Sequence, residues 1–172
     1  MNWLEEMGSV SEADHRPAAN TGRLRVLVAE ESRLLAEALM FSLETDPKLE
    51  PVGYALDGWE GLDYIGSLKP DVVLVGPHLA GLTPLRFAQF GHELYPNVLV
   101  ITLCYQLVPE VVESAYALGV DDVLPLNRSV DQLLRSISDA RLRRQTFERG
   151  LLRASQRPEL TLVKSGEVDA RP

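Results

Sequence analysis

Few side chains in this sequence of 172 residues form a pattern typical of catalysis or metal binding. Glu30 and Glu31 form an adjacent acid pair, Thr102 lies in an apolar run, and Cys104 is the single cysteine. One cysteine excludes a disulfide framework and a metal site built from cysteines. The sequence contains no Gly-rich phosphate loop, Ser/His/Asp order or paired Cys/His ligands. We therefore expect no catalytic residue, no metal site, no cofactor and no enzyme activity.

Two isolated residues each have two interpretations. His78, next to Pro77, is either a residue that accepts a phosphate group in place of a carboxylate or a surface loop residue. The sequence offers it no partner, which favours the loop interpretation. Cys104 is either a redox sensor or a small apolar core residue, and its place in an apolar run favours the core.

Short apolar runs alternate with amphipathic segments five times after residue 23, which predicts strands separated by single helices. The expected strands cover residues 24–29, 51–55, 71–75, 98–104 and 121–126. Caps at helix starts are expected at Asp57, at Thr83 followed by Pro84, and at Ser129. Another helix is expected to begin at Pro109 and to end at Gly119. The pattern predicts a doubly wound α/β domain with a five-stranded parallel sheet of flavodoxin-like order 2-1-3-4-5.

In such a sheet the functional site lies at the carboxyl ends of the strands. The residues expected there include Glu30, Glu31, Gly76, Thr102 and Leu126. Several segments in this order, "RVLVAEES", "EPVGYALDGWEGLDYIGSLKPDVVLVG", "YPNVLVIT" and "ALGVDDVLPLNRSVDQLLRSI", resemble the receiver domain of bacterial two-component response regulators. Counted from the first of these segments to the last, the resemblance covers about 120 positions.

The resemblance implies a particular phosphorylation site. In that family an acid pair after the first strand holds Mg²⁺, an aspartate ending the third strand is phosphorylated, and a Thr or Ser of the fourth strand contacts the phosphoryl group. A lysine after the fifth strand pairs with that group, and an aromatic residue three positions earlier reports phosphorylation. The chemistry requires a carboxylate nucleophile and positive charge beside the transferring oxygens.

This sequence departs from that pattern at three of these positions. Gly76 takes the place of the aspartate, Leu126 that of the lysine and Val123 that of the aromatic residue, while Thr102 matches. The resemblance therefore implies a degenerate pseudo-receiver without the phosphoacceptor aspartate. Because position 76 lacks a carboxylate, we interpret Glu30 and Glu31 as solvated glutamates near a helix N-terminus rather than as Mg²⁺ ligands.

The net charge of −8 is unevenly distributed along the chain. We expect a disordered N-terminal arm over residues 1–22, a receiver-like domain over 23–140, and a helical extension with a flexible basic tail over 141–172. The acidic, polar N-terminus contains no apolar run, so we expect no signal peptide, no membrane association and a cytoplasmic location. The arginines between Arg141 and Arg157 indicate either a solvated helix face, which we favour, or a phosphate-binding surface.

Apolar residues continue at spacings of three and four beyond the expected domain. This seam includes Phe147 and Leu151 but also Arg144, and it resembles a coiled coil. We expect these three residues and Val123 to form an interaction surface, and the chain to bind a protein partner or itself as a homodimer. The residues after the seam resemble the entry to a helix-turn-helix domain that the chain does not complete, so we do not expect nucleic acid binding by the chain alone.

These features support a phosphorylation-independent, response-regulator-like signalling protein that acts through protein–protein interaction. The first alternative is a small-ligand sensor that uses the vacated phosphorylation pocket; an enclosed apolar cavity beside Gly76 would favour it. The second is an enzyme or active phospho-switch that uses Glu30, Glu31 or His78; bound metal would favour it.

Overall fold

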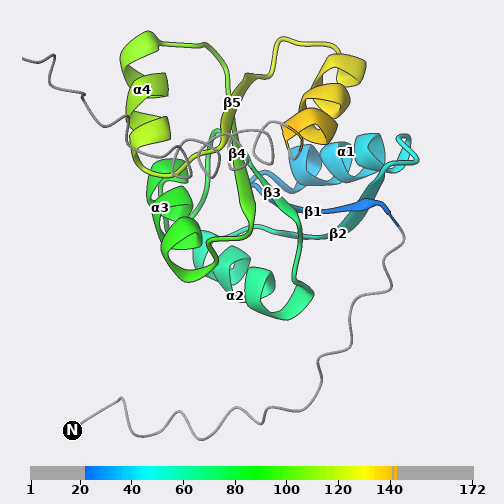
Figure 1. Cartoon of the computed structure of the whole chain (residues 1–172), viewed down its shortest axis with the longest axis horizontal. Helices are drawn as coiled ribbons and strands as arrows, with labels where there is room; N and C mark the ends of the chain where they lie inside the picture. The colour runs from blue at the N-terminus through cyan, green and yellow to red at the C-terminus, as the bar shows by residue number, and fades with distance from the viewer. Residues whose placement is uncertain (1–21, 141, 143–172) are drawn as a thin grey trace, which may run out of the picture.

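The computed structural model describes residues 22–140 and 142. Its five strands are β1 (Leu24–Ala29), β2 (Leu49–Ala55), β3 (Val72–Val75), β4 (Leu99–Cys104) and β5 (Asp122–Pro125). All neighbouring strands pair in parallel, in the order β2-β1-β3-β4-β5 (Figure 1). The predicted fold class and strand order are confirmed.

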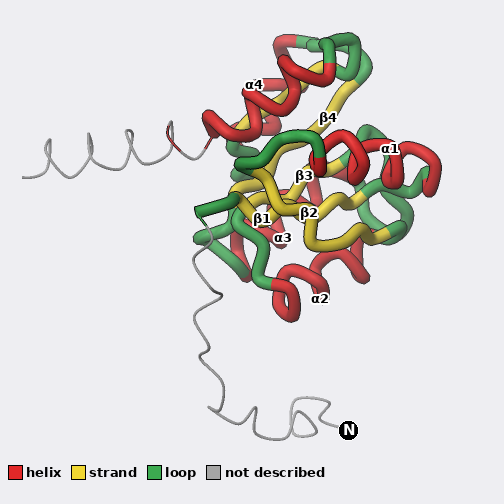
Figure 2. The backbone as a smooth tube through the Cα atoms, turned by 90° about the vertical axis from the view of Figure 1, so that its right-hand side faces the viewer, coloured by secondary structure: helices red, strands yellow, loops and turns green. Residues whose placement is uncertain are grey.

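Helices cover both faces of the sheet (Figures 1 and 2). The labelled helices are α1 (Arg33–Glu44), α2 (Gly58–Leu68), α3 (Pro84–Leu94) and α4 (Pro109–Ala117), and a last helix covers residues 130–140. Buried residues of α1 and the last helix share one hydrophobic cluster. Buried residues of α2, α3 and α4 share a second cluster with the opposite faces of the strands. The domain is therefore a three-layer sandwich with two cores.

The helix caps follow from local sequence. The Asp57 carboxylate accepts hydrogen bonds from the backbone N–H groups of Trp59 and Glu60 at the start of α2. Thr83 accepts one from the Arg86 N–H at the start of α3, with Pro84 in the first turn. Gly119, after α4, has a φ of +92°, a conformation that favours glycine. These helix boundaries agree with the predicted capping residues.

The strand register brings the site positions to one edge of the sheet. Ala29 pairs with Val75, and Val75 pairs with Thr102, so the residues after β1 and β3 leave the sheet side by side. Every residue of β3 is buried, because both faces of the sheet are covered. The buried strands therefore act as a rigid base for the loops at their carboxyl ends.

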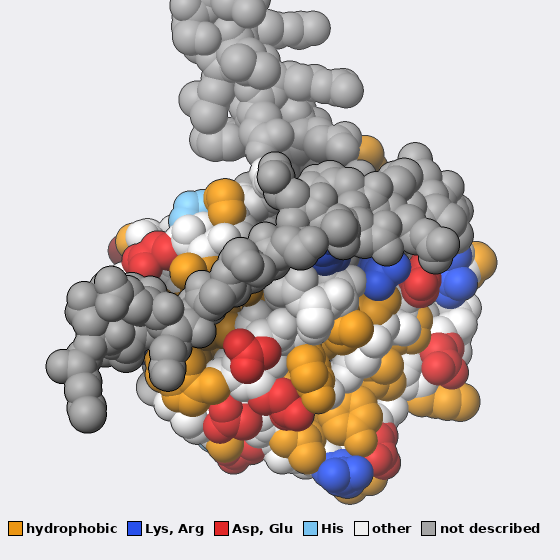
Figure 3. Space-filling model, turned by 90° about the horizontal axis from the view of Figure 1, so that it is seen from below, with side chains coloured by type: hydrophobic (Ala, Val, Ile, Leu, Met, Phe, Trp, Pro, Cys, Tyr) orange, Lys and Arg blue, Asp and Glu red, His pale blue; other side chains and the backbone are white. Residues whose placement is uncertain are grey.

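The surface of the domain is mixed. Figure 3 shows acidic side chains scattered among hydrophobic ones on one face of the molecule. Within the described residues, no helix has both the length and the apolar character needed to cross a membrane. The predicted N-terminal arm (except Gly22) and the predicted seam residues Arg144, Phe147 and Leu151 lie outside the part of the chain that the structure describes.

Candidate functional site

Glu30 is the first residue after β1, and its side chain is buried, with a relative exposure of 1%. Its backbone N–H donates to the Ala55 carbonyl at 3.0 Å. Its Oε1 accepts a hydrogen bond of 2.8 Å from the Ser32 N–H. Ser32 in turn is the N-cap of α1. The start of α1 therefore fixes one oxygen of the Glu30 carboxylate.

The second carboxylate oxygen, Oε2, is buried and has no hydrogen-bond partner among the described residues. It lies against Gly76, the residue that follows β3. A Cβ built on Gly76 would be 1.6 Å from Oε2 and 2.7 Å from Cδ of Glu30, far closer than real Cβ contacts. The Glu30 carboxylate thus occupies the space in which a side chain at position 76 would begin.

Burial raises the pKa of the Glu30 carboxyl above its ordinary value of 4.5. The neighbouring charge of Glu31 raises this pKa further, whereas the hydrogen bond from Ser32 and the proximity of His78 lower it. The site therefore favours a protonated Glu30 more than water does.

The expectation of two solvated glutamates is wrong for Glu30, although Glu31 is exposed. Glu30 is buried because it continues directly from a fully covered strand and Gly76 leaves room for its side chain. Sequence reasoning missed the combination of two residues. Glu30 is one methylene longer than the aspartate of the resembled family, and Gly76 leaves space for the longer side chain.

The other predicted site residues are divided between two sides of the sheet. Thr102 is buried, and with Cys104, Val123 and His78 it lines a mainly apolar hollow of about 560 Å³ between α3 and α4. Leu126 instead packs against the cluster beneath α1. The structure therefore brings Glu30 to Gly76, and Thr102 to Val123, but it does not place Leu126 in the hollow.

Two rings stand at the mouth of this hollow. The His78 and Tyr105 ring centroids are 5.7 Å apart, and both side chains are exposed. Cys104 is partly buried, and burial raises the pKa of its thiol above the ordinary value. A raised thiol pKa lowers the thiolate fraction at neutral pH, so this environment does not activate Cys104 as a nucleophile.

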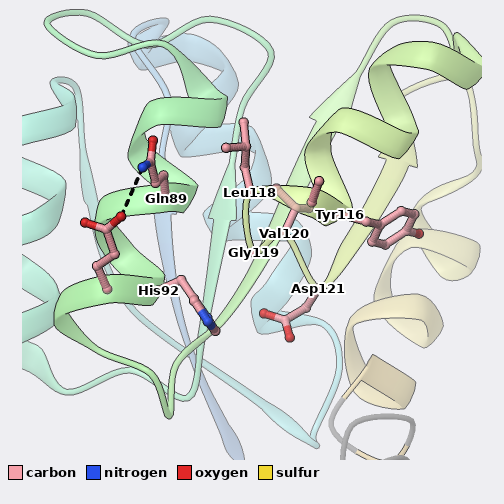
Figure 4. Close-up of a pocket in the computed structure, with 9 residues that line it drawn as sticks. Gln89, His92, Tyr116, Leu118, Gly119, Val120 and Asp121 are labelled. Atoms are coloured by element: carbon pink, nitrogen blue, oxygen red, sulfur yellow. Dashed lines mark hydrogen bonds between the residues drawn. The ribbon is translucent and has the colours of Figure 1, made fainter.

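A second hollow, of about 470 Å³, lies at the opposite edge of the sheet, between the ends of α3 and α4 (Figure 4). Some of its polar side chains bond to protein groups: Gln89 donates to Glu93 at 3.0 Å, and the Asp121 carboxylate accepts from the Val100 N–H at 2.8 Å. Sequence analysis did not predict this hollow. The bonds of Gln89 and Asp121 serve local structure.

The residues after β1 and β3 do not fit the Mg²⁺ ion that the receiver resemblance implies. One Glu30 oxygen is bonded to Ser32, the other is buried against Gly76, and position 76 supplies no carboxylate. Across residues 22–140 and 142, no group of three or more His, Cys, Asp or Glu side chains is arranged to hold a metal ion.

Comparison with known proteins identifies relatives but no matching family model. A Methanospirillum hungatei protein named protein-glutamate methylesterase/protein-glutamine glutaminase 1 is 31% identical over 112 residues, which are 64% of this chain and 33% of that protein. A Pyrococcus abyssi protein named protein-glutamate methylesterase/protein-glutamine glutaminase is 32% identical over 125 residues, which are 69% of this chain and 33% of that protein. The chain thus spans about a third of the length of these relatives.

Solved receiver domains share the fold. The response regulator domain of Thermotoga maritima CheB has a TM-score of 0.63 and 22% identity, covering 69% of this chain and 96% of that one. A CheY-like receiver domain protein from Methanospirillum hungatei has a TM-score of 0.63 and 19% identity, covering 73% and 98%. Together with the strand order, these similarities show that the described domain has the receiver fold.

The relatives contradict the expectation that the chain is not an enzyme, because they are named as enzymes. The matches cover only the receiver part of those proteins. The expectation rested on the absence of catalytic motifs from this sequence. That criterion cannot detect a relationship to enzymes that runs through a shared segment.

We expect Gly76→Ala to destabilise the fold by about 1–3 kcal/mol, because its Cβ overlaps the Glu30 carboxylate. Adding Glu30→Ala removes the overlapping carboxylate, so the double variant should recover part of the loss, with a coupling of about 1 kcal/mol or more. Urea unfolding of the four proteins in this cycle measures the coupling. Strictly additive effects would show that the two residues do not exclude each other.

The raised pKa of Glu30 predicts a pH-dependent stability. A protonated Glu30 suits the fold, so its favourable contribution is complete below the ordinary pKa of 4.5 and is lost as the pH rises through the higher folded value. Glu30→Gln should therefore lose less stability than the wild type as the pH is raised from below 4.5. Unfolding free energies at several pH values test this, with Glu113→Gln as the exposed control; parallel curves for wild type and Glu30→Gln would contradict it.

Proposed function

We propose that this domain is a phosphorylation-independent, receiver-like regulatory module that acts through protein contacts. The observation that carries the proposal is the Glu30 carboxylate, which lies against Gly76 and occupies the start of the space a side chain there would need. A receiver that is switched by phosphorylation needs that space for a nucleophile and for the incoming phosphoryl group.

Two further positions support the loss of the phosphorylation chemistry. Leu126 has no charge to neutralise a phosphoryl group and packs into the cluster beneath α1. Val123 is a small aliphatic residue packed against the other cluster, where the resembled family has an aromatic reporter. The retained Thr102 is buried but has no phosphorylated side chain to contact.

The exposed apolar side chains support a role in protein binding. Tyr105, Leu107 and Val111 are exposed around the loop between β4 and α4, and no charged residue lies between Tyr105 and Pro109. We propose residues 23–140 as the binding domain, with 1–22 and 141–172 as accessory segments. Because the enzyme relatives match through their receiver part, we also propose that this domain corresponds to the receiver portion of such proteins.

A small-ligand sensor is the second candidate, favoured by the hollow beside Thr102. Most of its exposed lining is apolar, and its volume of about 560 Å³ lies in the range of small-molecule sites. Gly76 does not line it, so it differs from the pocket expected from the sequence. Binding of apolar compounds that is abolished by Val123→Trp, with Leu94→Trp as a surface control, would support this candidate.

We predict that the protein takes up no phosphoryl group from acetyl phosphate. Gly76→Asp should remain largely unmodified as well, because Leu126 still supplies no charge to neutralise the phosphoryl group. Intact mass measured with and without acetyl phosphate provides the test, with His78→Ala as the control for histidine phosphorylation. A stable adduct on the wild-type protein would contradict phosphorylation independence, and its loss in His78→Ala would identify His78 as the acceptor.

Millimolar Mg²⁺ should leave the thermal unfolding midpoint within about 1 °C of its value without the ion. A ligand that binds only the native state must raise this midpoint, and the Glu30 oxygens are not arranged to accept the ion. Differential scanning calorimetry measures the midpoint. An increase of several degrees that disappears in Glu31→Gln would show that the acid pair still binds a cation.

A further inference from the structure

The outward face of α1 carries large apolar side chains that the fold leaves in water. Leu34 is 80% exposed and Phe41 is 71% exposed. Ala38, between them at helical spacing, is also exposed. Leu34, Ala38 and Phe41 lie on one stripe of the helix, which we name the α1 stripe. Single exposed apolar residues are normal, but a stripe of them marks an interaction surface.

The spacing of the α1 stripe is self-complementary. A large side chain stands at each end and the small Ala38 stands near the middle. If a second α1 helix lies antiparallel against the first, Leu34 of each copy faces Phe41 of the other. Ala38 then lies near the two-fold axis, where its small side chain allows the helices to approach closely. A two-fold axis requires this pairing of one surface with itself.

The charges of α1 favour the same arrangement. Arg33 stands in the first turn and Glu44 in the last, so the helix has no acid in its first turn and no base in its last. Both charges therefore oppose the dipole of their own helix. In an antiparallel pair each Arg33 reaches the level of Glu44 on the other copy, within about 3 Å along the helix axis at 1.5 Å per residue.

The side chains of Arg33 and Glu44 are exposed, so both charges can reach a partner. The Arg33 and Glu37 side chains are 67% and 54% exposed, and their ion pair is long, at 3.9 Å. In the proposed pair the two Glu37 side chains approach each other near the two-fold axis, and Arg33 of each helix offsets part of their repulsion. Both residues also contact the Tyr54 hydroxyl on β2, which holds this charged flank beside the stripe.

We propose that the α1 stripe binds the α1 stripe of a second copy of this chain, with the two helices antiparallel. This inference deepens the proposed function by naming one protein partner and its surface. A helix of 12 residues forms a small interface, so the dimer should be weak and visible at micromolar or higher concentration. The proposed surface differs from the seam around Phe147 and Leu151 that the sequence suggested.

Sedimentation equilibrium of the full-length protein over a wide concentration range tests this proposal. The wild type should dimerise. Phe41→Glu, which acts twice in a symmetric dimer, should raise the dissociation constant by about tenfold or more. The matched control is Leu94→Glu on α3, where the original side chain is similarly exposed, at 61%, and this change should have no effect. Circular dichroism verifies that each variant is folded.

Charge exchange provides the sharper readout. Arg33→Glu and Glu44→Arg should each weaken the dimer several-fold, and the double exchange should restore it to within about threefold of the wild type. A purely structural role for either residue would not produce this rescue. A monomer at all concentrations, with and without acetyl phosphate and Mg²⁺, or a dimer that is weakened by Phe147→Ser/Leu151→Ser but not by Phe41→Glu, would overturn the α1 proposal.

The same experiment with acetyl phosphate and Mg²⁺ separates the two proposals. Dimerisation that appears only with these additions and is abolished by Phe41→Glu would support the α1 surface and overturn phosphorylation independence. A monomer in every condition would overturn the α1 proposal, while the mass measurement would still decide phosphorylation independence separately.

Discussion

The contact between the Glu30 carboxylate and Gly76 is the constraint on which the site depends. One carboxylate oxygen is bonded to the N-cap of α1, and the other fills the space beside the end of β3. This side chain therefore joins the ends of two neighbouring strands and the start of a helix. A Cβ at position 76 would overlap the Glu30 carboxylate where it now lies, so Glu30 can stay buried in this position because residue 76 is glycine.

The fold itself does not depend on phosphorylation residues. Its stability comes from β1, β3 and β4, which lie between two helical layers and contribute to both hydrophobic clusters. Positions at the carboxyl ends of these strands can change while the two cores stay intact. A receiver fold with a filled site thus remains a rigid support for surfaces on its outer helices. In our proposals these surfaces, rather than a phosphoryl group, carry the regulatory interaction.

The sequence predicted the elements well because their signals are local. Asp57, Thr83 with Pro84, and Gly119 each act on residues within one helical turn, so no tertiary information was needed. The burial of Glu30 depends on its proximity to Gly76, which is distant in sequence, and reasoning from residue types alone placed its side chain in solvent. The exposure of Leu34 and Phe41 was missed because α1 is apolar on most sides, and periodicity did not identify which residues the sheet would cover. The relationship to enzymes was missed because it runs through the shared receiver segment.

A carbon-13 NMR titration of the Glu30 carboxyl group tests most directly whether this side chain fills the site. In the wild type, the account predicts a Glu30 pKa above the ordinary value, because the carboxyl is buried. In Gly76→Ala the new Cβ should displace the carboxylate toward water, and the pKa should fall toward the ordinary value. An ordinary Glu30 pKa in the wild type that Gly76→Ala leaves unchanged would contradict the account.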